Sequence, residues 1–376
     1  MKIVVFGLTI SSTWGNRHAD TWRGLSRALA QRGHRISFYE RDLSVFALHR
    51  DLGAWGSGQL WLFTSWDKIR YRARRDLEDA DVAIVTSACP DAPAAIDLVM
   101  SSPVPMRIFH DLDTAATLDY EESDLPVMYA APERLDMFDL VLSSTGGRAL
   151  DELQSHLRAR RVAALYAAVD PDHGFQVHGR SQPPKGLSYL ADQTGEDALA
   201  VKRFLIEPAR RLPHRVFRVG GNTLQPATAY GSNVIYERVL NAAARTAFYQ
   251  SSRLLLSLAG KTEKRMGFCP PELLFHAAAC GTPVLSENWE GLNLFLEPGE
   301  EVLIAESTED AVNATELLDG HLAQIGGRAR ERVLDEHTFA QRARHFEALL
   351  ENTANAANES LLDDVRQQVP FEDAAR

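Results

Sequence analysis

The segment from Gly267 to Glu306 constrains the fold of this chain more than any other stretch. Pro270 and Pro271 favour a helix start, because proline at the first helical position loses only an amide that has no partner. The small and apolar residues that follow predict a helix that packs closely on a sheet and ends at Gly281. Residues 283–286 (PVLS) then predict a buried parallel strand. The loop after that strand lies where open α/β sheets bind ligands.

Two parts of this segment, AAACGTPVLSENWEGL and EPGEEVLIA, resemble the nucleotide-binding domain of bacterial glycosyltransferases of the GT-B architecture. Within that group the sequence is similar to the CgeB-like family, named for a spore-maturation protein. The resemblance implies an α/β fold with two facing Rossmann-like domains and a cleft between them. It also implies a nucleotide-sugar-dependent glycosyltransferase of the hexosyltransferase type, with a donor on the C-terminal domain and an unknown acceptor on the N-terminal domain.

Length and composition fit this expectation. The chain has 376 residues, enough for two α/β domains with a core each. Its net charge of −11 argues against a nucleic-acid partner, because phosphate binding needs a basic surface. Cys89, Cys269 and Cys280 show no metal-ligand spacing, which indicates a reduced, cytoplasmic compartment. No apolar run approaches the length of a membrane span.

The chain is expected to divide into five parts. Residues 1–170 form the Rossmann-like acceptor domain, and residues 171–186 form a linker that contains prolines and polar residues. Residues 187–335 form the Rossmann-like nucleotide-sugar domain. The resemblance implies that a helix over 336–351 packs back on the first domain. The tail 352–376 is rich in Asn, Ala and Asp and is expected to fray.

Apolar runs predict the strands of both domains, and residues 43–66 have no clear pattern. The residues from 259 to 268 are expected to form a loop. The predicted strands cover residues 2–10, 35–39, 82–86, 106–110, 139–144, 186–191, 216–220, 253–258 and 283–286. A further strand is expected in residues 161–175 (RVAALYAAVDPDHGF), before the proline-containing exit from the first domain.

The loop after the first strand carries Trp14, Asn16, His18 and Asp20. Aromatic rings beside ionisable groups are costly on a surface without a function, so we expect Trp14 and Asn16 to face the acceptor. His18 and Asp20 are the candidate catalytic residues, because either side chain can act as a general base. The alternative is a polar surface loop whose side chains cap the next helix.

Asp111 and Asp113 follow a predicted strand and are candidates for the acceptor side. A lone Asp-x-Asp pair could hold a metal ion, but such pairs are common, and helix capping or an acceptor contact is the favoured interpretation. The resemblance implies no bound metal and no cofactor, because the nucleotide-diphosphate sugar is the substrate.

A basic cluster follows the predicted strand 253–258 and is a candidate clamp for the diphosphate. The alternative is a solvated surface loop. A histidine on the central helix and the loop after the next strand would hold the ribose and the sugar. The predicted donor-binding residues are Lys261, Lys264, Arg265, His276, Glu290, Gly291 and Leu292.

Several donor positions depart from the family pattern. Relatives carry a glutamate where this chain has His276, and retaining transferases carry acids at the positions of Phe268 and His276. Three functions therefore stay open: an active transferase, a catalytically silent GT-B protein that serves as a partner or sugar-binding subunit, and an epimerase of related architecture. A homo-oligomer is compatible with each.

Overall fold

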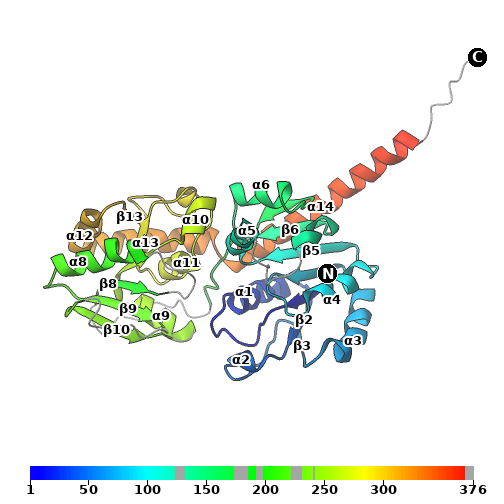
Figure 1. Ribbon diagram of the computed structural model, residues 1–376, viewed down its shortest axis with the longest axis horizontal. Helices are drawn as coiled ribbons and strands as arrows, with labels where there is room; N and C mark the ends of the chain where they lie inside the picture. The colour runs from blue at the N-terminus through cyan, green and yellow to red at the C-terminus, as the bar shows by residue number, and fades with distance from the viewer. Residues whose placement is uncertain (123–131, 173–184, 192–197, 222–230, 240–241, 369–376) are drawn as a thin grey trace, which may run out of the picture.

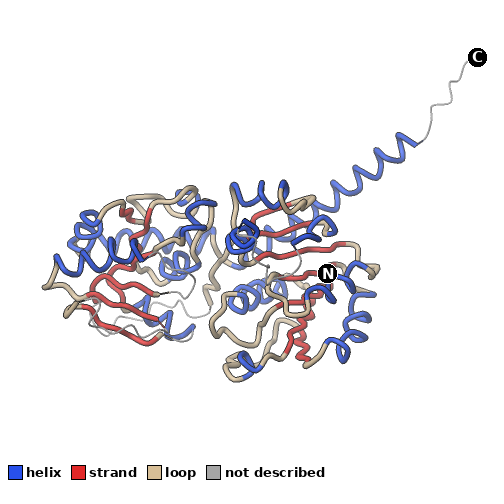
Figure 2. The backbone as a smooth tube through the Cα atoms, viewed as in Figure 1, coloured by secondary structure: helices blue, strands red, loops and turns tan. Residues whose placement is uncertain are grey.

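The computed structural model describes the chain except for residues 123–131, 173–184, 192–197, 222–230, 240–241 and 369–376. Two parallel sheets lie side by side, and each is covered by helices on both faces (Figures 1 and 2). These are two Rossmann-like α/β domains, as the sequence predicts. No helix in the described ranges is both long enough and apolar enough to cross a bilayer.

The first sheet has seven parallel strands in the order β3-β2-β1-β4-β5-β6-β7. Its strands are β1 (Lys2–Gly7), β2 (Arg35–Arg41), β3 (Gln59–Phe63), β4 (Val82–Thr86), β5 (Met106–Asp111), β6 (Leu140–Ser143) and β7 (Val162–Ala164). The helical segments between them are α1 (His18–Gln31), α2 (Ser44–Ala47), α3 (Trp66–Glu78), α4 (Ala92–Met100), α5 (Thr114–Glu122), η1 (Pro132–Met137) and α6 (Arg148–Ser155).

The second sheet has six parallel strands in the order β10-β9-β8-β11-β12-β13. Its strands are β8 (Lys185–Leu190), β9 (Phe217–Gly221), β10 (Val234–Arg238), β11 (Ser252–Ser257), β12 (Val284–Glu287) and β13 (Leu303–Ala305). The helical segments are α7 (Ala198–Val201), η2 (Lys202–Ile206), α8 (Glu207–Arg211), α9 (Ala242–Gln250), α10 (Lys261–Met266), α11 (Glu272–Ala279), η4 (Leu292–Leu294), α12 (Thr308–Glu316) and α13 (Asp319–Glu336).

The last helix, α14 (Phe339–Gln368), lies against α1 of the first domain. Phe339 and Phe346 are buried with Trp22 of α1 in one apolar cluster. Gly24 permits this approach, because a Cβ atom there would lie 2.7 Å from Cγ of Phe339. The helix was expected to end near 351, but it continues to Gln368, so the segment predicted to fray is helical over most of its length. Ala and Leu among its residues favour the continuation.

The chain crosses between the domains twice, and the two crossings touch each other. The amide of Val169 donates to the carbonyl of His337 at 3.0 Å, and the amide of Phe339 donates back to Val169 at 2.9 Å. The guanidinium of Arg342 donates to the carbonyls of Tyr166 and Ala167. The predicted linker, 171–186, falls mostly on residues outside the described ranges.

Most predicted strands are confirmed within a few residues, and β4 matches its prediction. The loop predicted over 259–268 is wrong, because Lys261–Met266 is the helix α10. Glu263 stabilises the start of this helix by accepting a hydrogen bond from the amide of Gly260 at 2.8 Å. Gly267 ends the helix with a φ of 67°. The short strands β3, β10 and β13 were not predicted.

Candidate active site

His18 and Asp113 form a hydrogen-bonded dyad at the carboxyl end of the first sheet. His18 begins α1 and is 4% exposed, and Asp113 lies between β5 and α5. Nε2 of His18 lies 2.7 Å from Oδ2 of Asp113. Burial raises the pKa of Asp113, but the hydrogen bond and charge of His18, with the charge of Arg17, lower it to about 2. Asp113 is therefore an anion that orients the imidazole through Nε2.

Three ring nitrogen atoms of His18 and His110 are buried without hydrogen-bond partners among the described residues. They are Nδ1 of His18 and both ring nitrogens of His110. Burial and the charge of His18 lower the pKa of His110 to about 3, so its ring is neutral. Burial, together with the charge of Asp113, raises the pKa of Asp111 to about 6. A buried polar atom without a partner costs roughly 1–3 kcal/mol, which a ligand hydroxyl could recover.

The loop between β1 and α1 is fixed by one buried carboxylate, Glu40 of β2. Glu40 is fully buried and accepts four hydrogen bonds. The amides of Ile10 and Ser11 donate to Oε2 at 2.8 and 2.9 Å, and the hydroxyls of Thr9 and Ser11 donate to Oε1 at 2.9 and 2.6 Å. The loop that leads to His18 is therefore held rigidly on the sheet.

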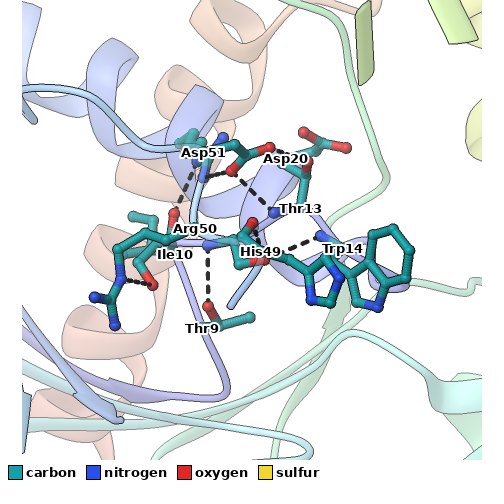
Figure 3. Close-up of polar contacts among 12 residues, drawn as sticks. Thr9, Ile10, Thr13, Trp14, Asp20, His49, Arg50 and Asp51 are labelled. Atoms are coloured by element: carbon teal, nitrogen blue, oxygen red, sulfur yellow. Dashed lines mark hydrogen bonds and ion pairs between the residues drawn. The ribbon is translucent and has the colours of Figure 1, made fainter. Parts of the chain in front are cut away.

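A second set of contacts joins this loop to residues 48–52 (Figure 3). The rings of Trp14 and His49 stack with their centroids 3.9 Å apart. Asp51 accepts from the amide and hydroxyl of Thr13 and pairs with Arg23 at 2.6 Å. These hydrogen bonds outweigh the effect of burial and lower the pKa of Asp51. Trp14 is thus a fixed, half-buried ring near the start of α1.

Asn16, predicted to face an acceptor, is engaged within its own loop. Its amide nitrogen donates to the carbonyls of Ser12 and Trp14, both at 3.0 Å. Its oxygen accepts from the amide of Ala19 at 3.1 Å. Asn16 therefore braces the first turn of α1, which is the capping alternative.

Asp20 joins the two domains through an ion pair with Arg245 of α9. Burial and the charge of Glu272 raise the pKa of Asp20, while Arg245 and His276 act in the opposite direction. Nε2 of His276 lies 3.5 Å from Oε1 of Glu272, one helical turn earlier on α11. Burial lowers the pKa of His276 to about 4. One polar cluster therefore combines α1 with α9 and α11.

The basic cluster of α10 is divided among several contacts. Lys264 pairs with Glu287, at the end of β12, at 2.6 Å. Arg265 lies 3.5 Å from Asp119 on α5 of the first domain. Lys261 is exposed at the start of α10. Oε2 of Glu287 is buried and has no partner within the described part of the chain.

Phe268 packs between the two domains in a left-handed backbone conformation, with a φ of 45°. Its ring lies against Gly147 of the first domain and Gly291 of the second, where an added Cβ would clash with it. Its carbonyl accepts from the amide of Gly146 at 3.0 Å, and its amide donates to Glu290 at 2.6 Å. Met266, two residues earlier, is buried in the core of the first domain.

The structure brings most of the predicted residues to the boundary between the domains, from both sides. The first domain contributes His18, Asp20 and Asp113, and the second contributes α10 and His276. Leu292 is 2% exposed in the core of the second domain, so its side chain is not available to a donor. Glu290 is exposed.

Sequence reasoning missed four polar residues of the site: His110 in the first domain and Arg245, Glu272 and Glu287 in the second. Glu272 was within reach, because it stands four residues before His276 and an α-helix places such residues on one face. Arg245 and Glu287 reach the site only through tertiary contacts, and no pattern in the neighbouring sequence marks them. No group of three or more His, Cys, Asp or Glu side chains that could hold a metal ion occurs within the described ranges.

A family model described as glycosyl transferase-like matches residues 197–348, which is less than half of the chain. Comparison with curated protein sequences gives no match. Sucrose-phosphate synthase from Thermosynechococcus elongatus superposes with a TM-score of 0.66 at 12% identity, over 94% of this chain and 99% of that chain. The chain has the GT-B fold.

Two further solved structures agree with this fold. HepE from Anabaena, in complex with UDP and glucose, has a TM-score of 0.62 at 11% identity and covers 94% of this chain and 100% of that chain. A glycosyltransferase from Rickettsia africae has a TM-score of 0.61 at 11% identity, over 94% and 98% of the two chains. Within the GT-B fold of this chain, the glycosyl transferase-like match covers most of the second domain, including α10 and α11.

Proposed function

We propose that this chain is a glycosyltransferase of the hexosyltransferase type, which moves a sugar from a nucleotide-diphosphate sugar to an acceptor hydroxyl. The observation that carries the proposal is the 2.7 Å contact between His18 and Asp113. This dyad lies in the first domain. Cys269, which belongs to the glycosyl transferase-like region, is near enough for the charges of Arg17 and Asp113 to act on the pKa of its thiol. The UDP and glucose in the HepE structure make UDP-glucose the first donor to test. The CgeB-like relation and a cytoplasmic location stay part of this proposal.

The dyad supports a single displacement with inversion at the anomeric carbon. Asp113 accepts the Nε2 proton of His18, so Nδ1 is the nitrogen that can take a proton from the acceptor hydroxyl. The acceptor oxygen bonds to the anomeric carbon as the bond from that carbon to the diphosphate oxygen breaks. The proton ends on His18, and the electron pair leaves with the nucleoside diphosphate.

Asp20 fits a different role from the general base that the sequence suggested as an alternative to His18. Its ion pair with Arg245 engages the carboxylate across the boundary between the domains. The guanidinium of Arg245 occupies this carboxylate, so the carboxylate is less available to an acceptor hydroxyl. We therefore assign Asp20 to holding α1 against α9.

The leaving diphosphate would be neutralised by the basic cluster of α10. Lys261 and Arg265 are its exposed members, and Lys264 and Arg265 each have a carboxylate within 3.5 Å. A diphosphate must compete with Glu287 for Lys264 and with Asp119 for Arg265. Lys261 is therefore expected to contribute most to binding of the diphosphate.

Glu272 supplies the carboxylate that position 276 lacks. It lies one turn before His276 on α11 and is 14% exposed. A carboxylate accepts two hydroxyl groups of a ribose, while the neutral imidazole of His276 adds one donor and one acceptor. We assign the ribose to Glu272, assisted by His276, and the sugar to the loop that contains Glu290 and Gly291.

The test is release of nucleoside diphosphate from a panel of nucleotide sugars in the presence of candidate acceptors. Wild type should turn over at least one donor, and His18→Ala and Asp113→Asn should each lower the rate by about a hundredfold or more. His156→Ala, an exposed histidine at the end of α6, is the matched control and should keep the rate. Nucleotide binding without turnover of any donor would favour a catalytically silent protein.

A further inference from the structure

A cavity of about 410 Å³ lies on the first domain, away from the residues assigned to the reaction. Its walls come from the loop of residues 50–58, from the start of β3 and from Ser11. This loop belongs to the stretch without a clear sequence pattern, and the proposed transfer does not use it. Pockets of roughly 300–1,000 Å³ hold small organic ligands, so this volume accommodates one or two sugar rings.

The cavity has one aromatic wall. Trp55 is half-buried and meets Phe38 edge-on, with the ring centroids 6.5 Å apart and the planes at 89°. Its Nε1 atom is buried and has no hydrogen-bond partner in the described part of the chain. Gly58 permits the close approach of the loop, because a Cβ there would lie 2.5 Å from the carbonyl oxygen of Ile36. The indole therefore has a fixed position beside the cavity.

The polar groups of the cavity carry no excess of positive charge. Nη2 of Arg50 pairs with Asp42 at 2.8 Å, and Nε donates to the hydroxyl of Ser11 at 3.2 Å. Gln59 adds an exposed amide, and Gly53 and Gly58 expose backbone at the wall. An anion gains little from a guanidinium already paired with a carboxylate. A ligand with neutral hydroxyl groups gains both donors and acceptors.

The cavity and the acceptor loop are parts of one rigid unit. Ser11 lines the cavity and is held by Glu40, whose carboxylate also fixes the loop that leads to His18. Figure 3 shows that Arg50 extends away from its neighbour His49, which stacks on Trp14. A ligand in the cavity is therefore held at a fixed distance from the dyad but does not touch it.

We propose that this cavity binds a neutral saccharide portion of the acceptor, at a position removed from the hydroxyl that reacts. The role of this saccharide as part of the acceptor rests on the proposed function, whereas binding of a saccharide in the cavity does not require a donor. Sugar rings present apolar C–H faces to an indole and hydroxyl groups to amides and guanidinium groups. The acceptor class that follows is a neutral oligosaccharide or a glycoconjugate of that kind.

Two glycines of the same loop provide a matched pair of variants. A Cβ at Gly53 or at Gly56 meets no atom within 4 Å, and neither backbone is left-handed, so both positions accept a side chain. Gly53 lines the cavity and Gly56 does not. Gly53→Leu should fill the cavity, whereas Gly56→Leu should leave it open.

The experiment is saturation-transfer NMR on the full chain with cellobiose, maltose, lactose and diacetylchitobiose, and with a uronate-containing disaccharide as the charged probe. At least one neutral disaccharide should bind wild type with a Kd on the order of 1 mM, and Gly53→Leu should weaken this by about tenfold or more. Gly56→Leu should bind as wild type does. The inference is overturned if no neutral disaccharide binds, if only the charged probe binds, or if Gly53→Leu binds unchanged.

The proposed function is measured separately in the same variants. If wild type turns over a donor and Gly53→Leu weakens disaccharide binding, both the transferase function and the saccharide site are supported. Donor turnover with no such response overturns the inference and leaves the transferase intact. Disaccharide binding in a protein that turns over no donor keeps the saccharide site but contradicts its assignment as part of an acceptor site.

Discussion

Gly291→Ala tests the contact that joins the donor loop to the other domain. Gly291 has a φ of 92°, and an added Cβ would lie 2.8 Å from Cε1 of Phe268. Gly299 has a similar φ of 84°, but its added Cβ would meet no atom within 4 Å. The two substitutions therefore share the cost of left-handed alanine, about 1 kcal/mol, and only one of them displaces the ring.

Displacing a packed ring adds roughly 1–3 kcal/mol to the loss of stability. We expect Gly299→Ala to lower the free energy of unfolding by about 1 kcal/mol and Gly291→Ala to lower it by about 2–4 kcal/mol. In a Phe268→Ala background the extra cost of Gly291→Ala should disappear, which gives a coupling of roughly 1–3 kcal/mol between the two positions. Urea titration followed by circular dichroism measures the wild type, the three single variants and the double variant.

The same variants report on the donor site. Because Gly291 belongs to the loop assigned to the sugar, Gly291→Ala should also weaken nucleotide-sugar binding, and Gly299→Ala should not. Equal losses of stability in Gly291→Ala and Gly299→Ala, or a coupling to Phe268 near zero, would refute the packing of the ring against this loop.

Three further predictions concern ionisable side chains. Glu40→Ala should lower the free energy of unfolding by about 2–6 kcal/mol, because it leaves two buried amides without an acceptor. Glu40→Gln should cost less, because the hydroxyl donors can rotate toward the remaining oxygen, and chemical denaturation distinguishes the two variants. The pKa of His276 is about 4 in the folded state, below the unfolded value of 6.5. The neutral ring therefore contributes fully to the free energy of unfolding above pH 6.5, and this contribution is lost as the pH falls toward 4. Wild type should therefore lose about 2 kcal/mol more than His276→Gln between pH 6.5 and 5, and equal losses would contradict the burial of a neutral ring. Lys261→Ala should weaken nucleoside diphosphate binding more than Arg265→Ala does, and the reverse order in calorimetry would contradict the assignment of the exposed lysine.

The fold was predictable because its signals are local. The strands of the two sheets are short apolar runs, and Pro271 and Gly281 delimit α11 closely. The helix α10 was missed because a six-residue helix rich in charged side chains has little apolar periodicity, and its stability comes from Glu263 and from Met266 in the core of the other domain. Long-range packing of this kind has no signature in a single sequence.

The candidate site was predictable in part for the same reason. His18 and Asp113 stand at the ends of predicted elements, yet only the fold shows that they meet across 95 residues of sequence. Position 276 has acidic neighbours that the family pattern does not show. Oε1 of Glu272 lies 3.5 Å from Nε2 of His276, and the charge of Asp20 acts on the pKa of the imidazole. His276→Glu is therefore expected to destabilise the site through like charges.

Calorimetric titration of the wild-type chain with nucleosides and nucleoside diphosphates tests the central claim most directly, because it needs no knowledge of the acceptor. The account predicts that at least one nucleoside diphosphate binds with one site per chain and more tightly than its nucleoside. Lys261→Ala should reduce this difference, and Glu272→Ala should weaken both ligands, since it removes the ribose contact. If no nucleoside diphosphate binds, or if each binds no better than its nucleoside, the second domain is not a nucleotide-sugar site and the proposed transferase function is contradicted.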